Sequence, residues 1–440
     1  MGKLQDTFRN IFKIHELRQR ILYTLALLVV VRLGAHITLP GIDSYLLSEA
    51  MANKTSDNLL GLYDLFAGGA FSNAAIFALG IMPYISASII IQLGGAIIPY
   101  FQKLQREGEE GRKKITQLTR YGTVIISLFQ SIGVVTGVIM NLSYNGVSVV
   151  PVEVQGFGFV FTSVAILVAG TVFMMWIGEQ ITDKGIGNGI SLIIFIGIIN
   201  RLPFALLDEY RLIAAGTRNI VIEVVILALM VLIIAGIVLV TQGTRRIPVQ
   251  YAKRVVGRKM YGGQSTHIPI KINMAGVIPI IFAMSIMAFP QTLSALFGVA
   301  SSSTGSFGQK FLYYMGPDYA PYHIMYALLI IFFTYFYTLI MFNPVDVANN
   351  MKKNGGFIPG IRPGKATSTY LTKVVNRTTL AGSLFLAAVA VLPVLLNVIL
   401  DIQGFWFGGT ALLIVVGVAI ETNKQIQSQI MMRHYKGFLQ

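Results

Sequence analysis

The side chains that most often carry out enzymatic chemistry are sparse and scattered in this sequence of 440 residues. It contains no cysteine, which excludes thiolate catalysis and cysteine-bound metals. HExxH, Walker and Gly-x-Ser-x-Gly motifs are missing as well. The five histidines stand far apart, at positions His15, His36, His267, His323 and His434. We therefore expect neither an enzyme nor a site for a metal or a cofactor.

One glycine-rich stretch, GIGNG at 185–189, superficially resembles a nucleotide-binding turn. A dinucleotide fingerprint follows a strand in a βαβ unit and precedes an acidic residue that binds the ribose. Neither accompanies this stretch. We interpret it as the turn that begins a helix at the membrane surface.

The composition places the chain in a membrane. Hydrophobic residues make up 54% and charged residues 12%, and the mean hydropathy is +0.68. Soluble domains carry about 25% charged residues, roughly twice as many. The net charge of +15 in such a chain indicates membrane topology and contact with anionic lipid head groups.

Ten apolar stretches are candidates for membrane-spanning helices, since a span needs about 20 apolar residues. They are 21–38, 74–98, 117–140, 157–178, 188–202, 219–241, 273–297, 322–342, 378–400 and 407–423. If the N-terminus is cytoplasmic, 28 of the 34 Lys and Arg residues fall on that side and five on the other. The positive-inside rule then predicts that both termini are cytoplasmic. Residues 1–20 contain Asp6 and Glu16 and indicate an interfacial helix instead of a cleaved signal.

Ionisable residues are rare inside these stretches. Arg32 is the clearest exception, and we expect it to be paired or to extend toward the outer interface. Glu223 and Glu421 lie near span ends. Ion-coupled transporters usually carry carboxylates or histidines within the membrane, so their scarcity disfavours a secondary transporter. That function remains the main alternative, because five spans on each side of 201–218 would also suit an inverted repeat.

An apolar segment at 59–70 precedes the second span. Its Leu59, Leu62, Tyr63 and Phe66 share one helical face, and Gly68 and Gly69 separate it from the span. Twelve helical residues reach only ~18 Å, too short to cross the membrane. The segment is either a surface helix on the outer leaflet or a re-entrant helix.

Two large inner loops, 242–271 and 343–376, have structure of their own. Alternation of Ile247, Val249 and Tyr251 with polar residues predicts a β-hairpin in the first. Glycines and prolines around Arg362 predict that the second loop is rigid and rich in turns.

Several isoleucines lie near the middle of their spans. They are Ile81, Ile85, Ile190, Ile194, Ile281 and Ile414. Their spacing alone is also typical of ordinary isoleucines that pack in the protein core or face lipid. A hydrophobic constriction that gates by excluding water is another role open to such a set.

Six blocks spread over the chain resemble one family. They are FALGIMPYISASIIIQ (77–92), MWIGEQITDKGIGNGIS (175–191), QSTHIP (264–269), NMAGVIP (273–279), PGIRPG (359–364) and FGGTALLI (407–414). This pattern resembles the SecY family of protein-translocation channels. Within the second-span block, Pro83 is expected to bend or loosen the helix.

The resemblance implies an all-α clamshell around a pore. Residues 1–202 would form one half with five spans, 203–218 an outer hinge loop, and 219–440 the second, inverted half. The six isoleucines would be the pore ring, and 59–70, with Gly68 and Gly69, the plug that closes the outer funnel. Ser86, Gln130 and Asn273 would lie at the lateral gate.

The resemblance also implies partners. Arg254, Arg258, Lys259 and Arg362 would dock the SecA motor ATPase or the ribosome. The small membrane subunits SecE and SecG, signal peptides, unfolded precursor chains and anionic lipids would complete the set, in a bacterial cytoplasmic membrane. The chain would move signal-bearing polypeptides across that membrane and release membrane segments sideways into lipid.

Overall fold

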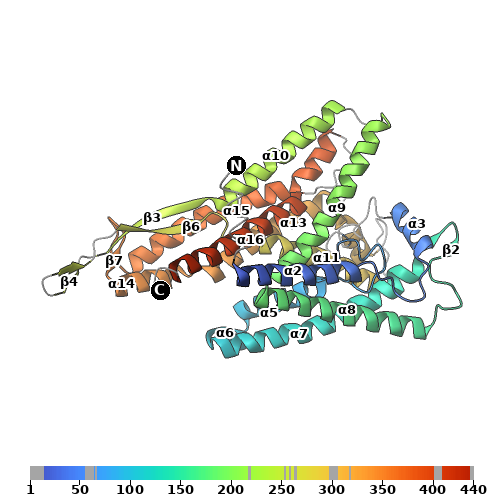
Figure 1. The fold of residues 1–440 in the computed structure, drawn as a ribbon, viewed down its shortest axis with the longest axis horizontal. Coiled ribbons are helices and arrows are strands. Elements are labelled where there is room, and N and C mark those ends of the chain that lie inside the picture. Colours follow the sequence, from blue (N-terminus) through green and yellow to red (C-terminus); the bar gives the residue numbers. More distant parts are fainter. Residues whose placement is uncertain are drawn as a thin grey trace. The chain divides into compact units, whose positions relative to one another are not determined.

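Long helices account for most of the chain, as its apolar stretches predict (Figure 1). The computed structural model describes residues 14–54, 64, 67–216, 220–251, 254–256, 259–261, 265–296, 306–316, 319–400 and 409–436. Ten of the described helices coincide with the ten predicted spans. They are α2 (His15–Gly34), α5 (Met82–Ile97), α7 (Glu109–Ile132), α8 (Phe157–Lys184), α9 (Gly189–Ala214), α10 (Ile220–Gln242), α11 (Ile278–Leu296), α13 (Ala320–Met341), α15 (Lys365–Leu400) and α16 (Gly409–Lys436).

Length and apolar composition alone qualify six of the described helices to cross a membrane. A seventh candidate is the pair formed by α5 and α6 (Pro99–Arg106), which is bent by 100°. Shorter described elements are α3 (Ser44–Lys54), α12 (Phe307–Tyr314), α14 (Pro344–Lys353), a π-helical turn at Gly133–Val138 and a 3-10 turn at Ile139–Asn141. Strands β1 (Ser143–Tyr144) and β2 (Val147–Ser148) form a small hairpin after the third span.

The chain forms two compact units. The first comprises Met1–Arg218, Met284–His323 and Val418–Gln440, and the second comprises Asn219–Ala283 and Ile324–Gly417. In the first unit, α7 packs along both α5 and α8, and α8 packs along α9. The predicted division at 203–218 stays a prediction.

The second predicted span begins later than expected. Residues 74–81 are turns, and α5 starts at Met82 with Pro83 in its first turn. Gly80 has φ +56°, a conformation that ends any helix before it and suits glycine. The expectation that Pro83 bends a helix in mid-span is therefore wrong. In the first turn a proline costs no hydrogen bond, because that N–H has no intrahelical acceptor.

The fifth span extends further than expected. α9 continues to Ala214, with Pro203 inside it, so most of the predicted outer loop 203–218 is helical. Arg201 is a residue of this helix.

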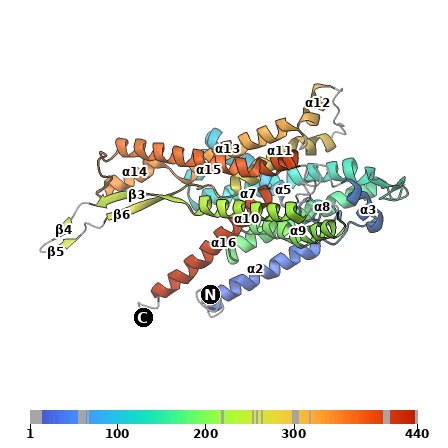
Figure 2. The ribbon, with the colours of Figure 1, turned by 90° about the horizontal axis from the view of Figure 1, so that it is seen from above.

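The two large loops predicted to be inner, 242–271 and 343–376, join into one sheet in the second unit. The predicted hairpin is confirmed: β3 (Thr244–Tyr251) pairs antiparallel with β6 (Ser265–Lys271), with Ile247 opposite Ile268. The second loop adds β7 (Gly356–Phe357), which pairs with β3. Both views show the hairpin extending beyond the end of α10, with β4 (Arg254–Val256) at its tip (Figures 1 and 2).

This sheet has its own hydrophobic core. It is formed by Ile247, Val249, Ile270, Ala348, Met351, Ile358, Leu371 and Val375. Strand β3, helix α14 and the first turns of α15 all contribute to it. The core packs together two loops that lie about 100 residues apart in the chain.

Candidate gate and plug site

The predicted pore isoleucines are distributed over both units. Ile81, Ile85 and Ile194 in the first unit are buried, and Ile190 is half-buried. Ile281 on α11 and Ile414 on α16 belong to the second unit and are also buried. A methyl group added to Gly178 would lie 3.2 Å from Cγ1 of Ile190, so Ile190 also packs against α8.

The turn at 185–189 fixes the start of α9 and with it the positions of Ile190 and Ile194. Asn188 caps the helix, because its side-chain oxygen accepts hydrogen bonds from the N–H groups of Ile190 and Ser191. The next N–H groups donate hydrogen bonds to side chains of other segments: residue 186 to Thr24, residue 187 to Gln425 and residue 189 to Thr182. With these N–H groups occupied, the turn is no phosphate cradle, as expected for a helix start.

The C-terminal part of the predicted plug is anchored to two spans. Leu59, Leu62, Tyr63 and Phe66 lie outside the described residues, but Asp64 and Gly68 are described. Asp64 is fully buried and accepts from Arg201 and from the hydroxyl and N–H of Ser72. Arg32 donates a hydrogen bond of 2.8 Å from Nη1 to the carbonyl of Gly68. This acceptor is a backbone carbonyl and not a carboxylate, so the expectation that Arg32 is paired or extends toward the outer interface stays a prediction.

Gly68 lies directly against α9. It has φ +63°, and a Cβ there would approach Cα of Gly197 to 2.7 Å. Only glycine at 68 allows this close backbone approach. Gly69, with φ +90°, donates its N–H to the carbonyl of Asp64 at 3.0 Å.

One stripe of α9 connects the predicted pore ring to the plug anchor. Ile190, Ile194, Gly197 and Arg201 recur at spacings of four, three and four, so they follow one face of the helix. The plug segment therefore rests on α9 one to two turns beyond Ile194. Sequence reasoning missed Asp64, Ser72 and Arg201. The signal that could have indicated them is Asp64, a single carboxylate within the apolar segment 59–70.

The predicted lateral-gate residues occupy different surroundings. Ser86 on α5 is half-buried, and Gln130 on the packed neighbour α7 is buried. Asn273, in the second unit, donates to the carbonyl of Gly276 at 3.0 Å. Its buried Oδ1 has no hydrogen-bond partner among the described residues.

A contact that sequence reasoning missed joins the second and seventh spans within the first unit. The hydroxyl of Ser285 on α11 lies 3.9 Å from Sδ of Met82 on α5, and both residues are buried. A thioether is a weak acceptor, so this bond holds the two helices only loosely.

The predicted docking residues lie on the two large loops of the second unit. Arg362 is exposed in the turn after β7, where its carbonyl accepts from Thr367. Arg254 belongs to β4 and Lys259 to β5 (Lys259–Tyr261), which pair antiparallel with each other. Arg258 lies outside the described residues.

The fold and this site define an all-α, polytopic membrane protein of the channel class, as predicted. The sequence model of the SecY family matches residues 75–423. The chain belongs to the SecY family. This membership agrees with the expectation that the chain is not an enzyme, and it decides against a secondary transporter.

Curated relatives and solved structures agree with this assignment. The chain is 47% identical to the protein translocase subunit SecY of Halalkalibacterium halodurans, over 98% of the chain and 99% of the relative. It is 44% identical to that of Escherichia coli, over 96% and 94%. A solved SecY structure, described for a plug domain that stabilises the closed channel, matches with TM-score 0.63 and 18% identity, over 93% and 91%. Canine Sec61 in a ribosome–channel complex matches with TM-score 0.58 and 17% identity, over 93% and 91%. The structural matches show that the fold is shared.

Proposed function

We propose that this chain is the channel-forming subunit that moves signal-bearing, unfolded polypeptides across the bacterial cytoplasmic membrane and releases membrane segments sideways into lipid. The observation that carries the mechanism is the stripe of α9 on which pore isoleucines and the plug anchor follow one another. It supports a constriction with a stopper on its outer side.

The six isoleucines form the resting seal. A narrow neck lined by branched apolar side chains is unfavourable for water and ions, so it excludes both without a tight mechanical fit. An apolar ring also makes no sequence-specific hydrogen bonds. Polypeptides of any sequence therefore pass it with similar ease.

The seam between the second and seventh spans opens for signal peptides. The contact shown between these spans is weak, a hydroxyl–thioether bond between Ser285 and Met82. Asn273, near the start of the seventh span, has a buried side-chain oxygen with no hydrogen-bond partner among the described residues. Interhelical hydrogen bonds in membranes contribute on average about 0.6 kcal/mol. An apolar signal helix replaces such contacts at small cost. Ser86 and Gln130 line the same seam.

The cytoplasmic sheet docks the partners that supply energy. Its core packs Ile361, the neighbour of Arg362, together with strand β3, which supports a joint surface for the SecA motor or the ribosome. The ribosome-bound canine channel has this fold. SecE and SecG are the small membrane partners. The excess of basic residues supports cytoplasmic placement of this sheet and of both termini.

Reconstitution tests the proposal. Vesicles that contain the chain, the two small subunits, the motor and ATP should protect a signal-bearing precursor from added protease. A precursor without its signal is the matched control. Equal protection of both precursors, or of neither, would contradict the proposed function.

A further inference from the structure

Helix α12 in the first unit presents an exposed aromatic face (Figure 2). Phe307, Phe311 and Tyr314 recur at spacings of four and three residues, so they share one side of the helix. These residues are 86%, 43% and 48% exposed. Large apolar side chains gathered on one exposed face indicate a surface that contacts a membrane or a partner.

Local hydrogen bonds hold this helix in shape. At its start, the N–H of Ser306 donates to Oε1 of Gln309 at 2.9 Å, the reciprocal half of a capping box. At its end, the N–H of Gly316 donates to the carbonyl of Tyr313 at 3.1 Å. Gln309, Leu312 and Tyr313 are half-buried and occupy the side opposite the aromatic face. The helix therefore has one side toward its own chain and one aromatic side directed away from it.

The end of α12 is held at the start of the eighth span. The ring of Tyr319, which directly precedes α13, lies 4.8 Å from the ring of Tyr313 and 5.6 Å from that of Tyr314, measured between centroids. The 22 residues of α13 rise about 33 Å, and the polar helix α14 follows them. The whole of α13 is therefore needed to cross a hydrocarbon core of about 30 Å. Its first residue, and with it the end of α12, lies at the edge of that core.

The exposed side chains change in kind at this level. Ile324 and Leu328 are exposed in the first turns of α13, as expected for aliphatic side chains that contact acyl chains. On α12 the exposed apolar side chains are aromatic, and aromatic residues are enriched where head groups meet acyl chains. Lys310, the one charged residue of α12, neighbours Phe307 and Tyr314 on the helix surface. A lysine in that place lays its stem along apolar surface and keeps its ammonium in water.

We propose that α12 is an interfacial anchor, whose Phe307, Phe311 and Tyr314 insert between the head groups and upper acyl chains of the leaflet in which the eighth span begins. The positive-inside rule predicts that this is the outer leaflet. The contact is aromatic and apolar, so it needs no anionic lipid. A protein partner would also cover this face, but the membrane is continuous with the exposed aliphatic side of α13 directly beyond Tyr319. The anchor requires only that α13 crosses the membrane, so it is independent of the proposed transport function.

Fluorescence quenching tests the depth of the aromatic face. Because the chain contains no cysteine, a single introduced cysteine places a polarity-sensitive dye at one position. The full chain with Phe307→Cys is reconstituted in vesicles of phosphatidylcholine alone. Quenching by a nitroxide near the head-group end of an acyl chain is compared with quenching by aqueous iodide. The matched control is Gly308→Cys, about 100° away on the same helix, where an added Cβ meets no atom within 4 Å.

The dye at position 307 should be quenched severalfold more by the lipid nitroxide, and severalfold less by iodide, than the dye at 308. Equal responses of the two dyes would overturn the proposal, because the aromatic face would then have no preferred direction. Shielding of the dye at 307 from both quenchers would also overturn it and assign the face to a protein contact. Stronger quenching by a nitroxide at the far end of the acyl chain would overturn the interfacial depth.

A second measurement starts from the unmodified chain. Phosphatidylcholine with a photoreactive group close to its head group should label the segment 306–316, as mass spectrometry of the digested chain would show. The variant Phe307→Ser/Phe311→Ser should lower this labelling severalfold, whereas labelling of the segment 320–328 serves as the internal reference and should not change. Lack of label in 306–316 of the unmodified chain would overturn the anchor. Equal labelling in the variant would overturn the role of the two rings.

Discussion

The ion pair between Asp64 and Arg201 predicts how firmly the proposed plug is held. Asp64 is fully buried, whereas Arg201 is 22% exposed. Arg201→Gln leaves a buried carboxylate with Ser72 as its remaining donor residue in the described set. Removal of one partner from a buried pair costs about 3–5 kcal/mol. We expect the lower end, about 3 kcal/mol, because Ser72 still donates two hydrogen bonds.

This loss of free energy destabilises only the closed channel if the displaced plug exposes Asp64 to water. The equilibrium then shifts toward opening by about 100-fold. Asp64→Asn should do less, about 1 kcal/mol or fivefold, because the partly exposed Arg201 reaches water without its partner. The double variant Asp64→Asn/Arg201→Gln should leak less than Arg201→Gln, since it leaves no buried charge unpaired.

Ion conductance in planar bilayers, measured without motor or precursor, distinguishes these variants. The matched control is Arg211→Gln, which removes an exposed arginine from the same helix and should conduct like the unmodified chain. The reasoning is refuted if Arg201→Gln conducts no more than the double variant. Equal leak from Arg201→Gln and Arg211→Gln would show that charge on α9, and not the pair, matters.

Three further predictions concern the seal, the docking surface and the cytoplasmic core. Glycine at the four pore positions of the first unit should raise resting ion leak severalfold, because it widens and wets the neck; unchanged conductance would remove them from the ring. Arg362→Glu should impair motor-driven export while membrane insertion of the chain stays intact; normal export would exclude Arg362 from docking, with Lys353→Glu as the control. Leu371→Ala should destabilise the sheet by about 2–5 kcal/mol and speed proteolysis of both inner loops. Protection equal to that of exposed Leu380→Ala would contradict this core.

The local pattern of apolar and polar residues was sufficient to predict the helices and the hairpin. Runs of apolar residues placed all ten spans, and alternation placed Ile247 and Val249 on the buried face of β3, because burial imposes its period on sequence. The start of α5 was misjudged for a local reason. Residues 74–81 are as apolar as a helix, and the left-handed conformations of Ala74 and Gly80 carry no hydropathy signal.

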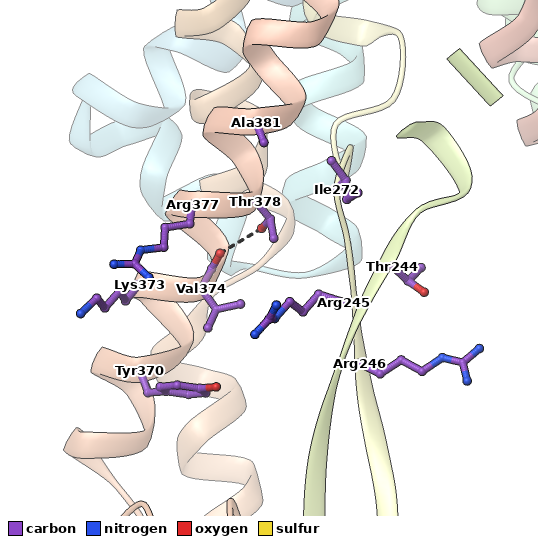
Figure 3. A pocket seen from close by; sticks show the side chains of 10 residues that line it. All are labelled: Thr244, Arg245, Arg246, Ile272, Tyr370, Lys373, Val374, Arg377, Thr378 and Ala381. Atoms are coloured by element: carbon purple, nitrogen blue, oxygen red, sulfur yellow. Dashed lines mark hydrogen bonds between the residues drawn. The ribbon is translucent and has the colours of Figure 1, made fainter. Parts of the chain in front are cut away.

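Relations between distant segments required the folded chain. The sequence by itself determined the membrane class, the number of spans, the hairpin and, through six family blocks, the residues expected at pore and gate. Only the tertiary structure decided that β7 completes the sheet of β3, that Arg201 meets Asp64 across 137 positions, and that Arg245 of β3 lines one cavity with Lys373 and Arg377 of α15 (Figure 3). The physical reason is that hydropathy and spacing report the surroundings of a single element. Ion pairs and cavities depend on which elements meet, and that follows from packing of the whole unit.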